Sequence, residues 1–139
     1  MNNAHNALDL IGRILIAYFF IPAGIEKIGG YTGTAAAMVS QGIPGWLLPL
    51  VILTEIGCGL AVLLGWHTRI GAFLLGGFTF LAVIFFHLSL AAGLHQTTIT
   101  VAETAVGGGL WILASHGAGA WSLDALLGRG HREPASALS

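Results

Sequence analysis

Residues 46–69 read WLLPLVILTEIGCGLAVLLGWHTR, and this stretch decides how the chain folds. It is apolar from Trp46 to Leu64 except for a short polar break in the middle. This break contains Glu55, the single carboxylate of the stretch. A membrane-spanning helix needs about 20 mainly apolar residues. The stretch therefore predicts a transmembrane helix, followed by a tight turn from Gly65 to Arg69.

The composition of the whole chain agrees with a membrane protein. Of its 139 residues 55% are hydrophobic and 8% are charged, whereas soluble domains have roughly 25% charged residues. Five Lys and Arg residues in total do not supply the basic patch that nucleic-acid binding requires. The single cysteine, Cys58, excludes an intrachain disulfide and a C-x-x-C motif. The chain is expected to be one small integral membrane domain.

Three further apolar segments predict an all-α, four-helix membrane bundle. The expected spans are residues 8–28, 46–64, 70–90 and 97–114, within a domain of residues 1–127. The glycine-rich residues 29–45 are too polar to span. They predict a short interfacial helix from Thr34 to Gln41, which lies on the membrane surface or covers the bundle, with Thr34 as its N-cap and Gly42 as its C-cap. Ser122 is expected to cap a short interfacial turn, and the polar residues 128–139 are expected to be disordered.

Four spans place both termini on the same side of the membrane. Arg69, Arg129 and Arg132 fall on that side, with Arg13 at the same end of the first span, and Lys27 falls on the other side. Because basic residues are enriched in cytoplasmic segments, we expect both termini to be cytoplasmic. Arg13 and Arg69 are then candidate anchors at the cytoplasmic rim.

Ionisable residues inside the spans are expected to gather in the outer half of the bundle. Such a residue costs about 2.5–3.5 kcal/mol on insertion scales, so each one asks for an explanation. Glu55 lies ~14 Å below the outer surface and Glu103 roughly 9 Å below it, at a rise of 1.5 Å per residue. His87, Glu26 and Lys27 lie near the outer ends of their segments. The pattern predicts one polar cluster with Glu55 beneath it.

Two interpretations of this cluster remain open. Its members could form a pocket for a small ligand, with Glu55 and His87 as the candidate catalytic, proton-handling groups. They could equally serve packing: an interhelical hydrogen bond for Glu55, a satisfied interfacial histidine for His87, and a partner of Lys27 or His87 for Glu103. Lys27 and Arg69 could simply extend to the lipid headgroups.

The sequence predicts no intrinsic cofactor. Haem bound by two histidines is not favoured, because His87 is the one histidine inside an expected span. No metal-ligand spacing is present, so no metal site is predicted. The glycines form neither a phosphate-binding loop nor a dinucleotide-binding fingerprint.

Four short motifs, in this order, resemble the DoxX family of small four-helix bacterial inner-membrane proteins. They are A-G-x-x-K at Ala23, Gly24 and Lys27, Q-G-I-P at Gln41 to Pro44, E-x-x-x-G at Glu55 and Gly59, and L-G-x-x-T-R at Leu64, Gly65, Thr68 and Arg69. The resemblance covers residues 8–127 and implies a bacterial inner-membrane location. Many relatives open the fourth helix with a Lys-Asn pair, where this chain has Val101-Ala102-Glu103-Thr104.

The resemblance also implies a link to respiratory or redox modules, since the small subunit of a thiosulfate:quinone oxidoreductase is similar. The chain would bind a quinone or small redox substrate and would act with a soluble or membrane redox partner protein. Lys27, Glu55, Arg69 and His87 match the family's motif positions. The candidate ligand-binding residues are Lys27, Glu26, Glu103 and Gln41.

Two other classes of function fit the same residues. A small proton-coupled transporter would use Glu55 as its coupling carboxylate, and substitution of Glu55 by glutamine would abolish its flux in liposomes. A scaffold or assembly subunit would use the polar groups for packing alone. The glycine-rich helix faces also suit a homo-oligomer.

Overall fold

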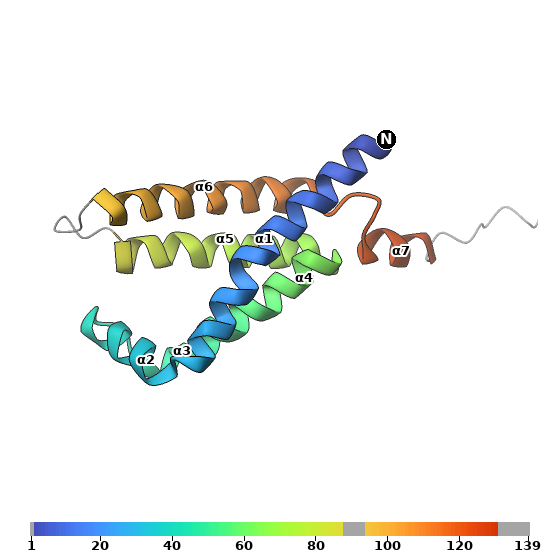
Figure 1. The fold of residues 1–139 in the computed structure, drawn as a ribbon. Helices are drawn as coiled ribbons and strands as arrows, with labels where there is room; N and C mark the ends of the chain where they lie inside the picture. Colours follow the sequence, from blue (N-terminus) through green and yellow to red (C-terminus); the bar gives the residue numbers. More distant parts are fainter. Residues whose placement is uncertain (1, 88–93, 131–139) are drawn as a thin grey trace, which may run out of the picture.

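The computed structural model describes residues 2–87 and 94–130, except for the side chains at 86, 87, 94–96, 129 and 130. Within this part every regular element is a helix (Figure 1). Four stretches are long and apolar enough to cross a membrane, namely Asn3–Gly29, Gly45–Leu64, Thr68–Phe85 and Thr97–His116. The predicted all-α membrane bundle with four spans is therefore confirmed.

The elements follow one another with short breaks. In order they are α1 (Asn3–Gly29), α2 (Tyr31–Ser40), η1 (Gly45–Leu47), α3 (Leu48–Leu53), η2 (Thr54–Cys58), α4 (Gly59–Leu64), α5 (Thr68–Ala82), η3 (Val83–His87), α6 (Leu94–His116) and α7 (Leu123–Gly130). Residues 128–130, expected in a disordered tail, still belong to α7, and the rest of that tail lies outside the described residues.

The second span is not a uniform α-helix. Its middle, η2, is a π-helix of five residues that includes Glu55. A π-turn widens the helix by one residue per turn, and such turns are frequent at functional sites. Apolar periodicity gave no sign of it, because both kinds of helix present the same run of apolar residues.

The interfacial helix begins earlier than expected. It starts at Tyr31, with Gly30 alone between it and the end of α1, so the prediction of Thr34 as N-cap is wrong. The Thr34 hydroxyl instead donates to the Gly30 carbonyl inside the helix. The C-terminal end of the helix lies close to the predicted glycine, since Gly42 follows it with a left-handed φ of +78°. There the N–H groups of Gly42 and Ile43 donate to the carbonyls of Val39 and Met38, which is a Schellman-type ending.

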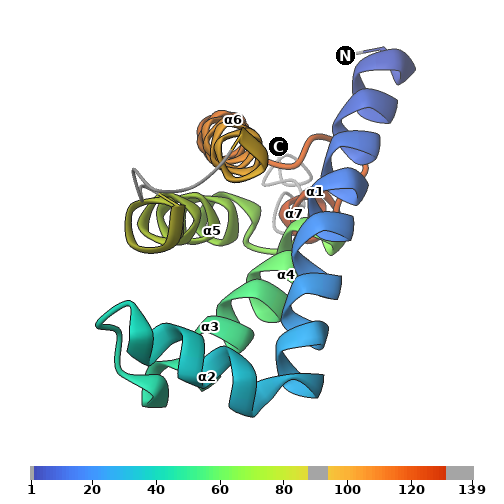
Figure 2. The same cartoon turned by 60° about the vertical axis from the view of Figure 1, so that its left-hand side comes forward.

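The helices form two groups that meet at a small core. Figures 1 and 2 show α5 and α6 side by side, with α1 crossing α3 and α4 in the other group. The core joins two side chains of the α1, α3 and α4 group, Phe20 and Val62, with three side chains of the α5 and α6 group, namely Ala72, Leu75 and Leu110. Trp111 packs close to α5 because Gly76 has no side chain: a Cβ there would lie 2.7 Å from Trp111 Cδ1.

The chain begins, turns and ends at one end of the molecule. Figure 1 places the N-terminus, the junction of α4 with α5, and α7 at this end, and α2 at the other. Gly65 makes the turn with a φ of +71°, and a Cβ there would also meet Ser122 and Arg13. The Ser122 hydroxyl accepts from Ala125 N–H at 3.2 Å, so the predicted cap of the last helix is confirmed.

Candidate functional site

An ion pair between α1 and η2 lies at the centre of the candidate site. Lys27 Nζ is 2.9 Å from Glu55 Oε1, and the two side chains are 28% and 6% exposed. The approach of the helices depends on Gly24, one turn before Lys27. A Cβ on Gly24 would lie 2.6 Å from Ile56 Cγ1 and 3.3 Å from Glu55 Cβ. The small residue thus brings the lysine within reach of the carboxylate.

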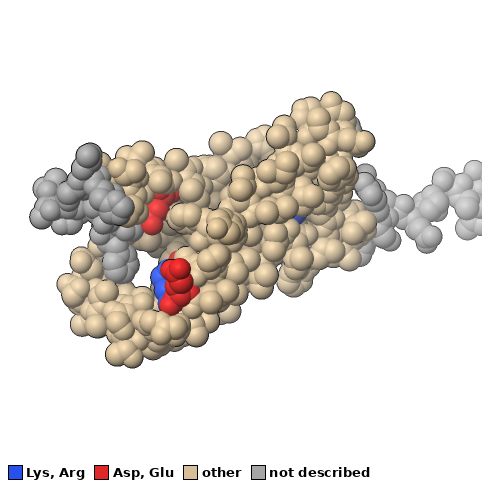
Figure 3. Space-filling model, viewed as in Figure 1, with Lys and Arg blue, Asp and Glu red and all other residues tan. Residues whose placement is uncertain are grey.

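A cavity of about 400 Å³ adjoins this ion pair. Ligand pockets usually have volumes of about 300–1,000 Å³, so the cavity is large enough for a small molecule or for part of a larger one. Most of its lining is apolar, and the charged residues that line it are Lys27, Glu55 and Glu103. In Figure 3 acidic and basic atoms border a hollow near one end of the molecule, and most of the other described surface in view is uncharged.

The ion pair leaves hydrogen-bonding capacity for a ligand. Glu55 Oε1 accepts from Lys27, whereas Glu55 Oε2 is buried and receives no hydrogen bond from the described residues. The ammonium group has three donors, of which one points to Glu55 and another makes a long contact of 3.5 Å with the Ala23 carbonyl. A ligand could therefore accept from Lys27 and donate to Glu55 at neighbouring positions.

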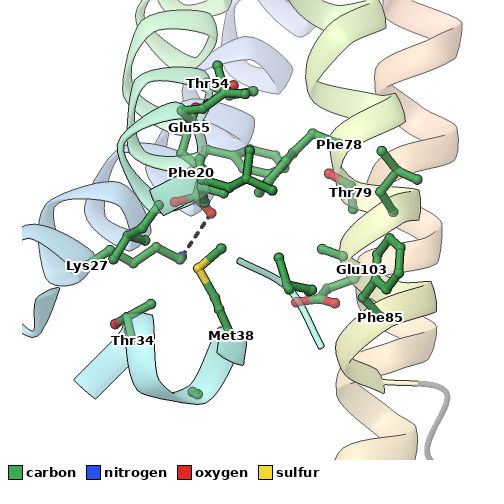
Figure 4. A pocket seen from close by; sticks show the side chains of 18 of the residues that line it. Phe20, Lys27, Thr34, Met38, Thr54, Glu55, Phe78, Thr79, Phe85 and Glu103 are labelled. Carbon is green, nitrogen blue, oxygen red and sulfur yellow. Dashed lines mark hydrogen bonds and ion pairs between the residues drawn. The ribbon is translucent and has the colours of Figure 1, made fainter. Parts of the chain in front are cut away.

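The opposite wall of the cavity contributes another carboxylate. Figure 4 shows Glu103, from α6, extending toward the cavity, across from the Lys27–Glu55 pair. Phe78 and Phe85 come from the same side, and Met38 of α2 reaches toward Lys27. Residues from all four spans and from the interfacial helix thus surround one space.

The sequence model of the DoxX family matches residues 8–88. The chain belongs to the DoxX family. It is similar to the inner membrane protein YqjF of Escherichia coli (strain K12), with 44% identity over 120 residues, which cover 86% of this chain and 92% of that protein. It is also similar to the inner membrane protein YphA of the same organism, with 33% identity over 135 residues, which cover 87% and 91% of the two chains. No solved structure matches the chain significantly.

Together with the four apolar helices, these relatives support a multi-pass location in the inner membrane. The predicted family resemblance is thereby confirmed. The names of these relatives give a membrane location and no activity, so the redox link that the resemblance implied stays a prediction.

This DoxX protein brings some of the predicted site residues together and separates others. Lys27, Glu55 and Glu103 line the same cavity, as the depth estimate suggested. Glu26 and Gln41 are exposed and do not line it. His87 is the last residue of η3, and its side chain lies outside the description.

Sequence reasoning missed Met38 and Thr79 as cavity residues. Met38 is buried although its helix was expected on the membrane surface or over the bundle, and Thr79 is a buried threonine in an otherwise apolar segment. A lone threonine in a span was a usable signal for Thr79. The sequence around Met38 contained no such signal, because the burial of Met38 depends on how α2 folds back over the cavity.

The two arginines predicted as rim anchors lie at the other end of the DoxX fold. Arg13 is 1% exposed, and it donates to the backbone carbonyls of Val62, Leu63 and Trp121. Arg69 is exposed and donates to the His116 carbonyl at 3.3 Å. Both therefore hold backbone groups near the chain's turn and C-terminal segment.

Asp124 completes this end of the molecule. Its carboxylate accepts from His67 N–H at 2.8 Å and from Thr68 N–H at 3.0 Å, at the start of α5. Burial by itself would raise the pKa of Asp124, but these hydrogen bonds and the nearby His67 outweigh it and lower the pKa below its ordinary value. The residue fastens α7 to the turn before α5.

Metal binding finds no support in the described residues. Among them no group of three or more His, Cys, Asp and Glu side chains is close enough to hold an ion. Lys27 also places a cation next to Glu55, where a metal would otherwise be drawn.

Proposed function

We propose that this protein is the membrane subunit of a redox or respiratory module and binds a quinone or small redox substrate in the cavity beside Lys27 and Glu55. The observation that carries the proposal is the buried Glu55 Oε2, which receives no hydrogen bond from the described residues and belongs to a cavity-lining ion pair. Buried polar groups normally have partners. A ligand that donates to this oxygen would supply the missing one.

A quinone would use a different member of the ion pair in each of its oxidation states. The quinone carbonyl would accept a hydrogen bond from Lys27 Nζ, and the quinol hydroxyl would donate one to Glu55 Oε2. Reduction of the quinone to the quinol takes two electrons and two protons. A redox partner protein would supply the two electrons. Glu55 in its protonated form would pass one proton to the oxygen that faces it and would then be reprotonated from water, and the second quinone oxygen would take its proton from water.

The proposal is tested by binding of a quinone to the purified full-length protein. We expect the quinone to raise the midpoint of thermal unfolding, because a ligand that binds the folded state stabilises it. Glu55→Gln and Lys27→Met should each weaken binding by tenfold or more, since each removes one of the two hydrogen-bonding groups.

The matched control is Glu26→Gln. Glu26 precedes Lys27 in α1 but is exposed and does not line the cavity, so binding should change less than twofold. The proposal fails if no quinone binds and if deletion of the protein leaves the cell's quinone pool unchanged.

A role in assembly is the second candidate, and the exposure of α6 favours it. This helix packs mainly on α5, and 11% of the apolar stretch that makes it a candidate span is buried. Its free side carries small residues such as Gly109, beside which a Cβ would have open space; small residues promote close helix contact in membranes. In this case Glu55→Gln would leave function intact, whereas Gly109→Leu would disrupt the complex.

A further inference from the structure

One edge of the cavity is apolar and lies within the membrane-spanning part of the fold. Leu50 of α3, Leu81 of α5 and Phe85 of η3 all line the cavity, yet they are 59%, 56% and 52% exposed. A side chain that both lines a cavity and is half exposed lies at its opening. These three residues, which we call the mouth, belong to the second and third candidate spans.

The inner part of the same cavity, beyond the 28% exposed side chain of Lys27, is closed and holds the Glu55 carboxylate. Phe20, Leu48, Glu55 and Thr79 line it and are each at most 5% exposed. Figure 4 shows Glu55 and Lys27 on the side formed by α1 and η2, with Phe85 at the facing wall. The cavity therefore has a polar position inside and an apolar opening between α3 and the wall formed by α5 and η3.

We propose that the ligand is a membrane-dissolved amphiphile, a quinone with a long isoprenoid tail, and that it enters sideways from the bilayer through the mouth. Its head group would sit at Lys27 and Glu55. A cavity of about 400 Å³ cannot hold a long tail together with the head group, so the tail leaves between Leu50, Leu81 and Phe85 into the lipid. This inference rests on the proposed function and narrows it from a quinone or small redox substrate to a membrane-dissolved quinone.

The physical basis is the polarity of the opening. A water-soluble ligand that entered through the mouth would have to pass leucine and phenylalanine side chains in the membrane-spanning part of the fold, where polar groups are costly. An isoprenoid tail loses nothing there, since its surroundings in the mouth and in the lipid are equally apolar.

The test compares two quinones on the full-length protein in lipid nanodiscs. One carries an isoprenoid tail and the other has the same head group without a tail. Binding is measured from the concentration dependence of the shift in the midpoint of thermal unfolding. In the wild-type protein we expect the tailed quinone to bind at least tenfold more tightly at equal total concentration, because its tail concentrates it in the bilayer next to the mouth. Leu81→Trp, which fills the mouth, should weaken binding of the tailed quinone tenfold or more and that of the tail-less quinone less than twofold.

The control is Leu74→Trp. Leu74 is an exposed residue two turns earlier on the same face of α5 and does not line the cavity, so both quinones should bind as in the wild type. Equal effects of Leu81→Trp on the two quinones, or no effect on either, would overturn access through the mouth while leaving the proposed function in place. Absence of binding by either quinone to the wild-type protein would instead overturn the proposed function itself.

Discussion

Arg13 and Arg69 lie at the same end of the fold but differ in burial and in the number of hydrogen bonds that they donate. Arg13 is buried, and its guanidinium binds the last carbonyls of α4 and a carbonyl of the segment before α7. A cation at this position also opposes the negative end of the helix dipole. Arg69 is exposed and makes one described hydrogen bond. The fold therefore depends far more on Arg13.

We expect Arg13→Gln to lower the free energy of unfolding by about 1.5–3 kcal/mol, the range for hydrogen bonds to charged groups. Arg69→Gln, the matched control, should change it by at most about 0.5 kcal/mol, as surface substitutions usually do. Denaturant titration of the purified protein in detergent micelles measures both. Similar losses in the two variants would show that burial of Arg13 contributes little.

The contact between α1 and η2 decides the geometry of the ion pair. Gly24 lets the two helices approach, and the π-turn sets the direction of Glu55. The contact is tight, because a Cβ at Gly24 would overlap Ile56 Cγ1, which lies close to the backbone and cannot swing away easily. The site is therefore sensitive to a single methyl group on the facing helix.

Gly24→Ala should destabilise the protein by about 1–3 kcal/mol through overpacking, and it should weaken ligand binding by separating Lys27 from Glu55. Gly12 lies on the same helix, and a Cβ there would meet nothing within 4 Å. Gly12→Ala should leave binding unchanged and raise stability by up to about 1 kcal/mol through helix propensity. Thermal unfolding and quinone titration of the pair provide the comparison, and equal behaviour of the two variants would contradict the close contact.

The docking of α7 on the start of α5 gives the protein a pH dependence at low pH. The lowered pKa of Asp124 means that its carboxylate stabilises the folded state above the unfolded-state pKa of about 3.9. This contribution is lost as the pH falls through the lower folded-state pKa. Between pH 6 and pH 3 the wild-type midpoint of unfolding should therefore fall more than that of Asp124→Asn, in which the charge is already absent. Parallel curves for the two proteins would refute the role of Asp124.

The start of α1 together with α7 and the candidate site lie at opposite ends of the described structure. The N-terminus and α7 lie together, away from α2 (Figure 1). We propose that the end with the start of α1 and with α7 is cytoplasmic, because Arg13, Arg69 and Arg129 belong to it and Lys27 to the other. The cavity would then lie in the half of the membrane that faces away from the cytoplasm.

Cysteine labelling tests this orientation in a Cys58→Ser background. A membrane-impermeant maleimide should label Ser40→Cys, at the exposed end of α2, in spheroplasts. It should label Asn3→Cys, at the start of α1, only after lysis. The reverse pattern would place the termini outside and the cavity on the cytoplasmic side.

Much of the fold could be predicted because its determinants are local. Four apolar runs, the glycine pair after Lys27 and the turn at Gly65 are visible in the chain, since span length and helix breaks depend on neighbouring residues alone. The presence of Glu55 and Glu103 in the same half of the bundle also follows from the rise per residue. Their presence on one cavity shows how far such reasoning reaches.

The tertiary structure alone decided which residues meet. Three features depend on which side of each helix faces the other helices. They are the pairing of Lys27 with Glu55, the burial of Arg13 under the C-terminal segment, and the position of Met38 in the cavity lining. In a soluble protein the apolar face would reveal that side. In lipid the outward and inward faces are both apolar, so the sequence determined that these helices span the membrane and how deep each charge lies, whereas packing decided where each charge points.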